Sequence, residues 1–103
     1  MKVVWSPDSN LEYAQILEYL LEKWDSKVAI NFMDDTDKVV EELKQNPQMY
    51  PRLEVKPSLR KAFISKHTSL IYRVENQEIQ LLHFWNNRQN PERLKRLIRR
   101  YCY

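Results

Sequence analysis

Two histidines, one cysteine and a large number of basic side chains are the residues of this sequence that could do chemistry. A histidine can act as a base near neutral pH, but a neighbouring group must position its ring. We interpret His67, between two predicted strands, as an ordinary turn residue. We interpret His83, on a predicted core face, as a partly buried histidine with satisfied hydrogen bonds. Because no paired carboxylates lie near the histidines at ligand spacing, and Cys102 stands alone, we expect no metal site and no cofactor.

The basic side chains are concentrated in the second half of the chain. Residues 1–51 carry a net charge of −5, whereas residues 52–103 carry +8. This asymmetry indicates a surface that binds an anionic partner. The candidate target-binding residues are Arg60, Lys66, Arg73, Arg88, Arg93 and Arg96. The alternative interpretation is that Arg60 and Arg73 pair with Glu75 and Glu78 across a sheet. In that case the basic residues of the C-terminal helix form only its solvated side.

Length and composition limit the class of protein. A chain of 103 residues with 43% hydrophobic and 30% charged residues is typical of one globular domain. Glycine is absent, which excludes phosphate-binding loops that need glycine where the backbone approaches a phosphate. The sequence contains no apolar run of about 18 residues, the length that a membrane-spanning helix needs. Its N-terminus lacks the apolar region of a signal peptide, so we expect a cytoplasmic protein with no membrane partner.

The first half predicts a short strand followed by two helices. Residues 2–5 form an apolar run that is typical of a strand. Ser6 before Pro7 predicts the start of one helix, Ser26 can cap a second, and Pro47 ends it. About two residues separate the helices, so they must fold back as an antiparallel hairpin. Their predicted apolar stripes are Leu11, Ala14, Leu17, Leu20, Leu21 and Trp24, then Val28, Ala29, Phe32, Met33, Thr36, Val39, Val40 and Leu43.

The second half predicts three antiparallel strands and a last helix. The strands span residues 59–66, 69–75 and 78–85, with two-residue turns at 67–68 and 76–77. In this register Phe63 faces Tyr72, Tyr72 faces Leu81 and Leu70 faces His83. The face under the helical hairpin contains Phe63, Leu70, Tyr72, Val74, Ile79, Leu81 and His83. The opposite face contains Arg60, Ala62, Ile64, Lys66, Ser69, Ile71, Arg73, Gln80, Leu82 and Phe84. The helix after Pro91 has the apolar stripe Leu94, Leu97, Ile98 and Tyr101, and Trp5, Trp24 and Trp85 are expected in the core.

This order of elements, with these strand sequences, resembles the RelE/ParE superfamily of bacterial toxins, the toxin halves of type II toxin–antitoxin modules. The resemblance lies in Leu59-Arg60-Lys61, in the segments 69–74 and 79–85, in the segment 87–91 and in the spacing from Leu43 to Pro47. It implies an α+β fold in a single domain over residues 1–103. In that fold a short N-terminal strand, joined to a three-stranded antiparallel meander in one sheet, accompanies an antiparallel helical hairpin and a basic C-terminal helix.

The superfamily has two known activities. RelE-type members cleave messenger RNA in the ribosomal A site without a metal, so basic side chains must stabilise the transition state. ParE-type members lack that set of residues and are associated with inhibition of DNA gyrase. The nuclease pattern has two alternating basic residues on the second strand, an arginine early in the third, and an arginine and then a tyrosine after the fourth.

Only part of the nuclease pattern is present in this sequence. Arg60 matches the first position, but the next falls on Ala62 and the third-strand position falls on Ser69. Arg88 matches the arginine after the fourth strand, and no tyrosine follows it before Tyr101. Arg73 could substitute, since it shares a predicted face with Arg60. The sequence therefore assigns no catalytic residue, and Arg60, Arg73 and Arg88 stay as candidates.

We therefore predict a ParE-like toxin that inhibits growth by binding a macromolecular target such as DNA gyrase. The resemblance implies neutralisation by a cognate antitoxin, a role in plasmid stabilisation, and a homodimer or a toxin–antitoxin hetero-oligomer. Two alternatives remain open. One is a RelE-like, ribosome-dependent endoribonuclease that needs no metal, and the other is a non-toxic binding module on a degenerate toxin scaffold.

Overall fold

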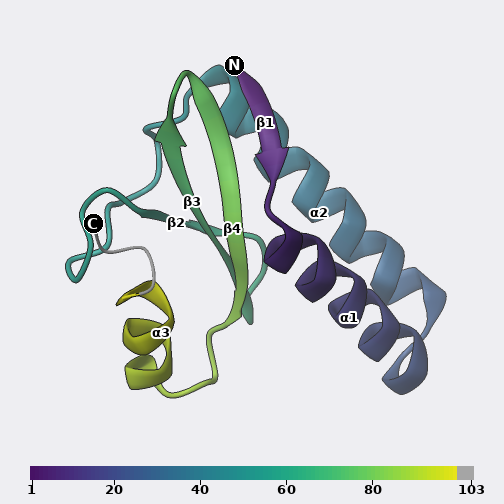
Figure 1. Cartoon of the computed structure of the whole chain (residues 1–103). Coiled ribbons are helices and arrows are strands. Elements are labelled where there is room, and N and C mark those ends of the chain that lie inside the picture. The colour runs from purple at the N-terminus through teal and green to yellow at the C-terminus, as the bar shows by residue number, and fades with distance from the viewer. Residues whose placement is uncertain (100–103) are drawn as a thin grey trace.

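A computed structural model describes residues 1–99, which form a four-stranded sheet with helices on both faces (Figure 1). The elements are β1 (Lys2–Trp5), α1 (Pro7–Lys23), α2 (Ser26–Gln45), β2 (Arg60–Phe63), β3 (Thr68–Glu75), β4 (Glu78–Asn86) and α3 (Pro91–Ile98). The strand order is β1-β4-β3-β2, with β1 parallel to β4 and the other pairs antiparallel. The predicted α+β fold, with its helical hairpin and its meander joined to β1 in one sheet, is confirmed.

Short polar side chains cap the two long helices. The Ser6 side chain accepts a hydrogen bond from the Ser9 N–H and Pro7 is the first residue of α1, as predicted. The predicted cap of α2 is wrong by one residue, because Asp25 Oδ1 accepts the Val28 N–H at 3.0 Å and Ser26 already lies within the helix. The helix α2 ends at Gln45, before Pro47, as predicted.

The buried side of α1 differs in part from the predicted stripe. Its inward row consists of Tyr13, Ile16, Leu17 and Leu20, which pack against the main core. Leu11 and Leu21 are exposed because they lie away from this row around the helix axis. Trp24 is 66% exposed because it is the C-cap residue, beyond the last turn that faces the sheet.

The predicted register between β2 and β3 is wrong. Residues 64–67 form a loop instead of the ends of a two-residue turn, so Phe63 pairs with Ser69 and Arg60 pairs with Tyr72. The pair at 67–68 contains no glycine or asparagine to adopt the positive φ angles of a tight hairpin, and Thr68 is β-branched. The observed register differs from the predicted one by an odd number of residues, so each side chain of β2 lies on the face opposite to the predicted one. Phe63, expected in the core, is 54% exposed, whereas Ala62 and Ile64 are buried under the hairpin.

The hairpin between β3 and β4 has the predicted turn but also a bulge. Asn76 and Gln77 adopt φ angles of 55° and 60°, and Tyr72 pairs with Leu81 as predicted. Beyond this pair the register shifts between Ile71 and Tyr72, so Ile71 faces His83. Leu70 therefore pairs with Phe84 instead of His83, and Phe84 joins the core that His83 was predicted to join.

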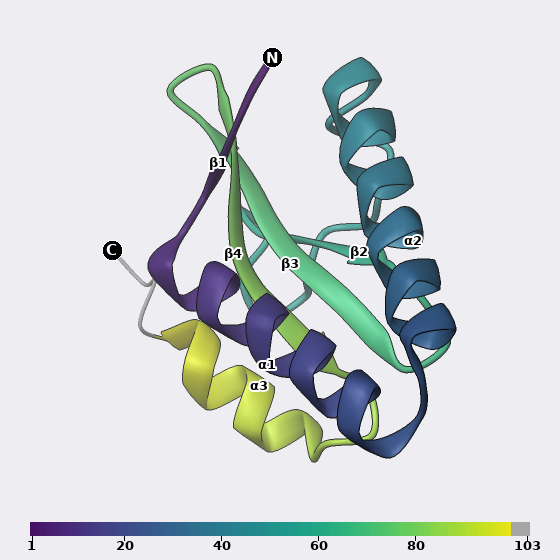
Figure 2. The same ribbon diagram turned by 90° about the vertical axis from the view of Figure 1, so that its right-hand side faces the viewer.

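The sheet has a core on each face. The main core lies under α1 and α2, and it contains Phe32, Leu43, Ala62, Leu70, Tyr72, Ile79, Leu81 and Phe84. The second core lies under α3, and it contains Leu59, Ile71, Leu82, Trp85, Leu94 and Ile98. Trp85 is buried as predicted, and the half-buried Trp5 packs edge-to-face against Tyr13 and at a tilt against Phe84. Tyr101 of the predicted last stripe lies outside the described residues. Figure 2 shows the antiparallel hairpin of α1 and α2, which in Figure 1 lies on the other side of the sheet from α3.

Candidate functional site

Arg60, on β2, is bound to the backbone of the segment before it. Its Nη1 donates to the carbonyl oxygen of Tyr50 at 2.7 Å and to that of Gln48 at 3.2 Å. The same segment continues into an isolated bridge between Arg52 and Arg60, which covers this edge of the sheet. Arg60 therefore fixes the irregular chain between α2 and β2.

The side chain of Tyr72 supports the same segment from beneath. It is fully buried, and its hydroxyl donates to the Pro47 carbonyl oxygen at 2.8 Å. Burial raises the pKa of Tyr72 to about 12, although the nearby charge of Arg60 lowers it. Arg60 and Tyr72 together anchor the chain where it leaves α2.

Ala62 and Ser69 are the residues that the sequence analysis aligned with two of the four cation positions of the RelE-type pattern. Both side chains are fully buried. Ala62 pairs with Leu70 under the helical hairpin, and the Ser69 hydroxyl donates to Asn87 Oδ1 at 2.8 Å. Longer basic side chains at these positions would displace packed neighbours. The sheet therefore presents no cation from either position.

Arg73 lies on the sheet face opposite the helical hairpin. Its Nε is 2.6 Å from Gln80 Oε1 and 3.0 Å from Glu75 Oε2. The alternative interpretation is therefore right for Arg73 and Glu75 in part only, because both residues lie on β3 and the pair does not cross the sheet. The predicted sharing of one face by Arg60 and Arg73 is wrong, because Arg60 is paired with Tyr72. The structure therefore does not bring these two candidate residues together.

His67 and Arg88 form a contact that the sequence pattern did not indicate. The Arg88 Nη2 lies 2.9 Å from His67 Nε2, and the Asn87 N–H donates to the His67 carbonyl oxygen at 2.8 Å. The Asn86 side chain accepts the Arg88 N–H at 2.9 Å. Partial desolvation, followed by the charges of Arg88 and Lys66, lowers the pKa of His67. A neutral imidazole that accepts a hydrogen bond from a guanidinium fits this geometry.

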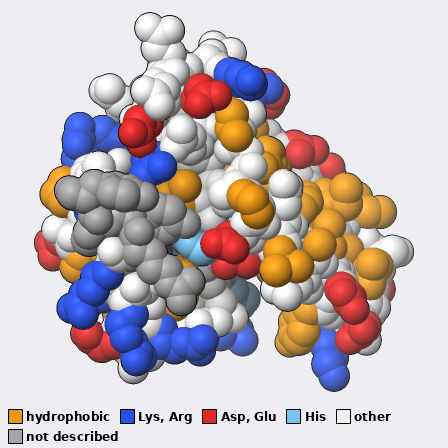
Figure 3. Space-filling model, in the orientation of Figure 1, with side chains coloured by type: hydrophobic (Ala, Val, Ile, Leu, Met, Phe, Trp, Pro, Cys, Tyr) orange, Lys and Arg blue, Asp and Glu red, His pale blue; other side chains and the backbone are white. Residues whose placement is uncertain are grey.

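This contact lies beside a cleft of about 950 Å³. One wall comes from α1 and α2, and the other comes from the loop before β3, the loop after β4 and α3. Its lining includes Tyr19, Trp24, His67, Arg88 and Arg93. Figure 3 shows basic side chains gathered around α3, with hydrophobic and acidic side chains over α1 and α2. The structure therefore brings Arg88 and Arg93 to one cleft with Lys66 nearby, and places Arg96 on the exposed side of α3.

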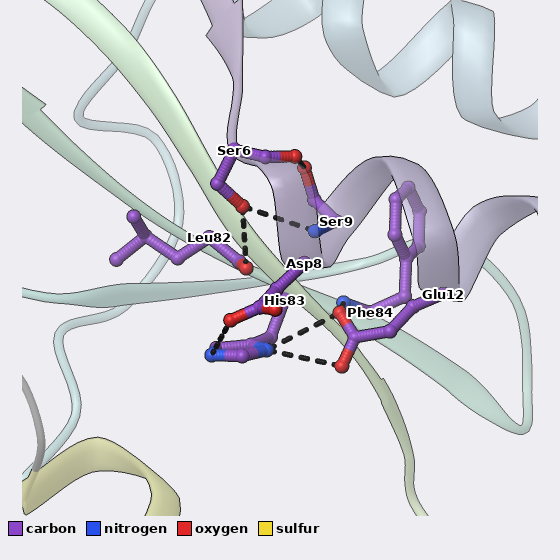
Figure 4. A network of polar contacts seen from close by, with 7 residues as sticks. All are labelled: Ser6, Asp8, Ser9, Glu12, Leu82, His83 and Phe84. Atoms are coloured by element: carbon purple, nitrogen blue, oxygen red, sulfur yellow. Dashed lines mark hydrogen bonds and ion pairs between the residues drawn. The ribbon is translucent and has the colours of Figure 1, made fainter.

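His83 is the centre of a polar network that joins α1 to β4 (Figure 4). The ring is 3% exposed, and its Nδ1 lies 3.0 Å from Glu12 Oε2. Glu12 Oε1 also accepts the Phe84 N–H at 3.0 Å, and Asp8 Oδ2 lies 4.0 Å from His83 Nε2. The predicted buried and satisfied histidine is confirmed, although its partners were not predicted. The only signal in the sequence was that Asp8 and Glu12 stand one helical turn apart.

Neither a metal site nor a membrane span is found in the described part of the chain. Residues 1–99 contain no group of three or more His, Cys, Asp or Glu side chains that could hold a metal ion. No helix in this range is long and apolar enough to cross a membrane.

Comparison with known proteins identifies relatives. A family model described as the ParE toxin of the type II toxin–antitoxin system, parDE, matches residues 3–91. A search of curated protein sequences finds no match. Among solved structures, the chain is similar to a chain of the chromosomal ParDE TA system from P. aeruginosa, with 22% identity and a TM-score of 0.72. That match covers 84% of this chain and 95% of the other.

Two further solved structures share the fold. The YoeB/ParE toxin from Agrobacterium tumefaciens is 16% identical with a TM-score of 0.64, over 84% of this chain and 99% of that one. The YoeB dimer from Staphylococcus aureus is 12% identical with a TM-score of 0.61, over 81% and 92% of the two chains. At these identities the solved structures establish the fold alone.

Proposed function

This chain belongs to the ParE toxin family of type II toxin–antitoxin systems, and from that premise we propose that it inhibits growth by binding a macromolecular target rather than by cleaving RNA. The proposal includes neutralisation by a cognate antitoxin, a cytoplasmic location and a role in plasmid stabilisation. DNA gyrase is the target that the family suggests.

The observation that carries this proposal is the burial of Ala62 and Ser69. Cleavage without a metal places extra negative charge on the phosphate, and fixed cations must stabilise it. Loss of one such group typically lowers the rate by roughly 10²–10³, and loss of two lowers it by about 10⁴ or more if the effects are partly additive. Arg60 is engaged with backbone carbonyls and Arg73 lies on the other face, so neither supplies the missing charge.

The basic surface supports a binding role. Lys66, Arg88, Arg93 and Arg96 are exposed or half-buried side chains around the cleft and α3, where they can attract an anionic partner. An antitoxin segment rich in acidic residues would have the complementary charge. The same side chains are available to a target surface, which suggests that an antitoxin neutralises the toxin by competing for them.

One observation favours RNA cleavage as the second candidate function. His67 is held at 2.9 Å from Arg88 and its pKa is lowered, so a neutral imidazole stands beside a guanidinium. A neutral imidazole can act as a base, and a guanidinium can stabilise a phosphate. This pair lacks the additional strand cations of the RelE-type pattern, which is why we place it second.

Controlled expression tests the proposed function. Induction of the soluble, folded chain should stop growth, and co-expression of its cognate antitoxin should restore growth. Normal growth at high levels of soluble, folded protein would contradict the proposal and support the degenerate binding module. Purified toxin should also inhibit supercoiling of relaxed plasmid by DNA gyrase, which tests the suggested target separately.

A further inference from the structure

We propose that copies of this chain associate head to tail, with an acidic, apolar surface of one copy lying on a basic, apolar hollow of the next. The inference goes beyond the proposed function, because neither surface belongs to the cleft that carries Arg88 and Arg93. It assigns a second copy of the chain as the partner of both surfaces.

The first surface is the outer face of the helical hairpin, which is turned away from the sheet and from the cleft. Its four large apolar side chains are between 41% and 58% exposed, and none of them lines the cleft. On α2 these side chains and a carboxylate recur at helical spacing, and on α1 they lie away from the inward row. The outer face consists of Leu11, Glu18, Leu21, Ile30, Met33 and Asp37.

The charge of the outer face is negative. Asp34 and Glu41 continue its row on α2, and Lys44 Nζ, which follows them, is paired with Glu41 Oε1 at 2.9 Å. Figure 3 shows hydrophobic and acidic side chains together over α1 and α2. Large apolar side chains gathered on one exposed face indicate contact with another macromolecule. The carboxylates beside them favour a partner with a positive charge.

The second surface is a hollow of about 330 Å³ between α3 and the segment before β2. Its floor is apolar, because Leu53 and Leu94 pack in the core under α3, and the exposed Val55 also lines it. Phe63 extends the apolar area, since its ring is 54% exposed and its centre lies 5.8 Å from Lys61 Nζ. The α3 hollow is defined here by Arg52, Leu53, Val55, Lys61, Leu94 and Lys95.

The α3 hollow carries a positive charge. Within residues 1–99, no carboxylate lies at ion-pair distance from Arg52 or Lys61. Lys95 Nζ lies 3.2 Å from Glu92 Oε1, and Glu54 also lines the hollow. The three cations outnumber these two carboxylates, so the hollow has the charge that complements the outer face.

The two surfaces lie on opposite sides of the molecule. In Figure 1 α3 is on the other side of the sheet from the hairpin. A copy whose hollow is filled by a neighbour therefore still presents its own outer face, and such contacts build open chains. A two-fold dimer would instead bring two outer faces together, or two hollows, and like charges would repel in both arrangements.

Sedimentation equilibrium of the purified full chain tests the inference. The weight-average mass should rise with concentration beyond twice the mass of one chain, without a plateau at the dimer. At a fixed concentration it should fall as the salt concentration is raised from about 50 mM to about 500 mM, because salt screens the charges of both surfaces.

Two variants each disable one of the surfaces. Leu21→Lys removes an apolar contact from the outer face and adds a cation, whereas Lys61→Glu reverses a charge of the hollow. Each should weaken association by about tenfold or more. A mixture of the two should form a 1:1 heterodimer and nothing larger, because the first keeps an intact hollow and the second keeps an intact outer face. The affinity in this heterodimer should equal that of the wild-type contact within about twofold.

Matched variants control for hydrophobicity and charge elsewhere. Tyr19→Lys changes a side chain of α1 that is as exposed as Leu21, at 55%, but lies in the cleft. Lys2→Glu changes the net charge as Lys61→Glu does, at the exposed start of β1. Each control should change the association constant by less than about twofold, as expected for a residue outside the contact.

Four results would overturn the inference. The wild-type chain could stay monomeric, its mass could level off at twice that of one chain, the mixed variants could stay monomeric, or a control could weaken association as much as its matched variant. A monomeric chain whose outer-face NMR resonances shift on addition of an amphipathic leucine–lysine peptide would assign this face to a different, basic protein. The growth assay keeps the proposed function separate, because growth arrest by a monomeric chain would contradict only the head-to-tail contact.

Discussion

Replacement of Arg60 tests whether this side chain maintains the fold or serves only as a surface cation. Arg60→Ala removes the hydrogen bonds from Nη1 to the carbonyl oxygens of Tyr50 and Gln48, at 2.7 and 3.2 Å. Arg60→Lys keeps the positive charge but cannot reproduce the planar guanidinium. The two variants therefore separate geometry from charge.

The size of the effect follows from these contacts. A hydrogen bond from a charged donor contributes about 1.5–3 kcal/mol, and the more exposed bond to Gln48 adds less than the bond to Tyr50. We expect Arg60→Ala to lower the free energy of unfolding by about 2.5 kcal/mol, which is roughly 10 °C in Tm for a domain of this size. Arg60→Lys should recover less than about half of that loss.

The assay is thermal unfolding followed by circular dichroism, with Arg96→Ala on the exposed side of α3 as the matched control. That control should change Tm by less than about 3 °C. Since the charge of Arg60 lowers the pKa of Tyr72, Arg60→Ala should raise this pKa further and Arg60→Lys should leave it nearly unchanged. Unchanged stability in Arg60→Ala, or full recovery in Arg60→Lys, would refute the structural role and restore Arg60 as a candidate binding residue.

Three further predictions concern the same architecture. The pKa of Tyr72 is raised from 10.0 to about 12, so the unfolded state loses this proton first and stability should fall between pH 10 and 12 by up to about 3 kcal/mol. Tyr72→Phe should abolish this part of the pH dependence in urea unfolding curves, and an unchanged dependence would contradict the assignment. Glu12→Ala should lower stability by about 3 kcal/mol because it removes the carboxylate that contacts His83 Nδ1 and accepts the Phe84 N–H, whereas the surface control Glu18→Ala should cost less than about 0.5 kcal/mol in the same curves. Asp25→Ala removes the N-cap of α2 and should cost about 1 kcal/mol, and a loss below about 0.3 kcal/mol would show that the cap is dispensable.

Local sequence patterns predicted the elements and one of the two hairpins. The Ser6-Pro7 start of α1 and the stop before Pro47 depend on neighbouring residues alone. The turn at Asn76-Gln77 was predicted because polar turn residues separate two strands of alternating pattern. These features need no information from distant parts of the chain.

The errors concern pairings between distant residues. The lack of glycine or asparagine at 67–68 argues against a two-residue turn there, but it does not specify the loop over residues 64–67, and this difference exchanges the faces of Ala62 and Phe63. The bulge beside Ile71 is likewise set by packing on two faces, and it moves His83 away from the predicted core. For a sheet, an odd register error reverses every assignment of side chains to faces.

The candidate site could be predicted only in part for the same reason. Charge asymmetry indicated Lys66, Arg88 and Arg93 as binding residues, and the structure places them around one cleft. Charge asymmetry could not indicate that Arg88 contacts His67, because that contact depends on where the loop before β3 and the loop after β4 end. Arg60 looked like a surface cation because its backbone partners belong to an irregular segment without a periodic pattern.

Mapping of messenger RNA 5′ ends after induction tests the central claim most directly. The account predicts that growth stops while no new, codon-positioned ends arise in translated messages, because Ala62 and Ser69 leave the sheet without the cations that cleavage needs. Discrete cuts within ribosomal A-site codons, present with the wild-type chain and abolished by Arg88→Ala, would contradict the account and identify this toxin as a ribonuclease.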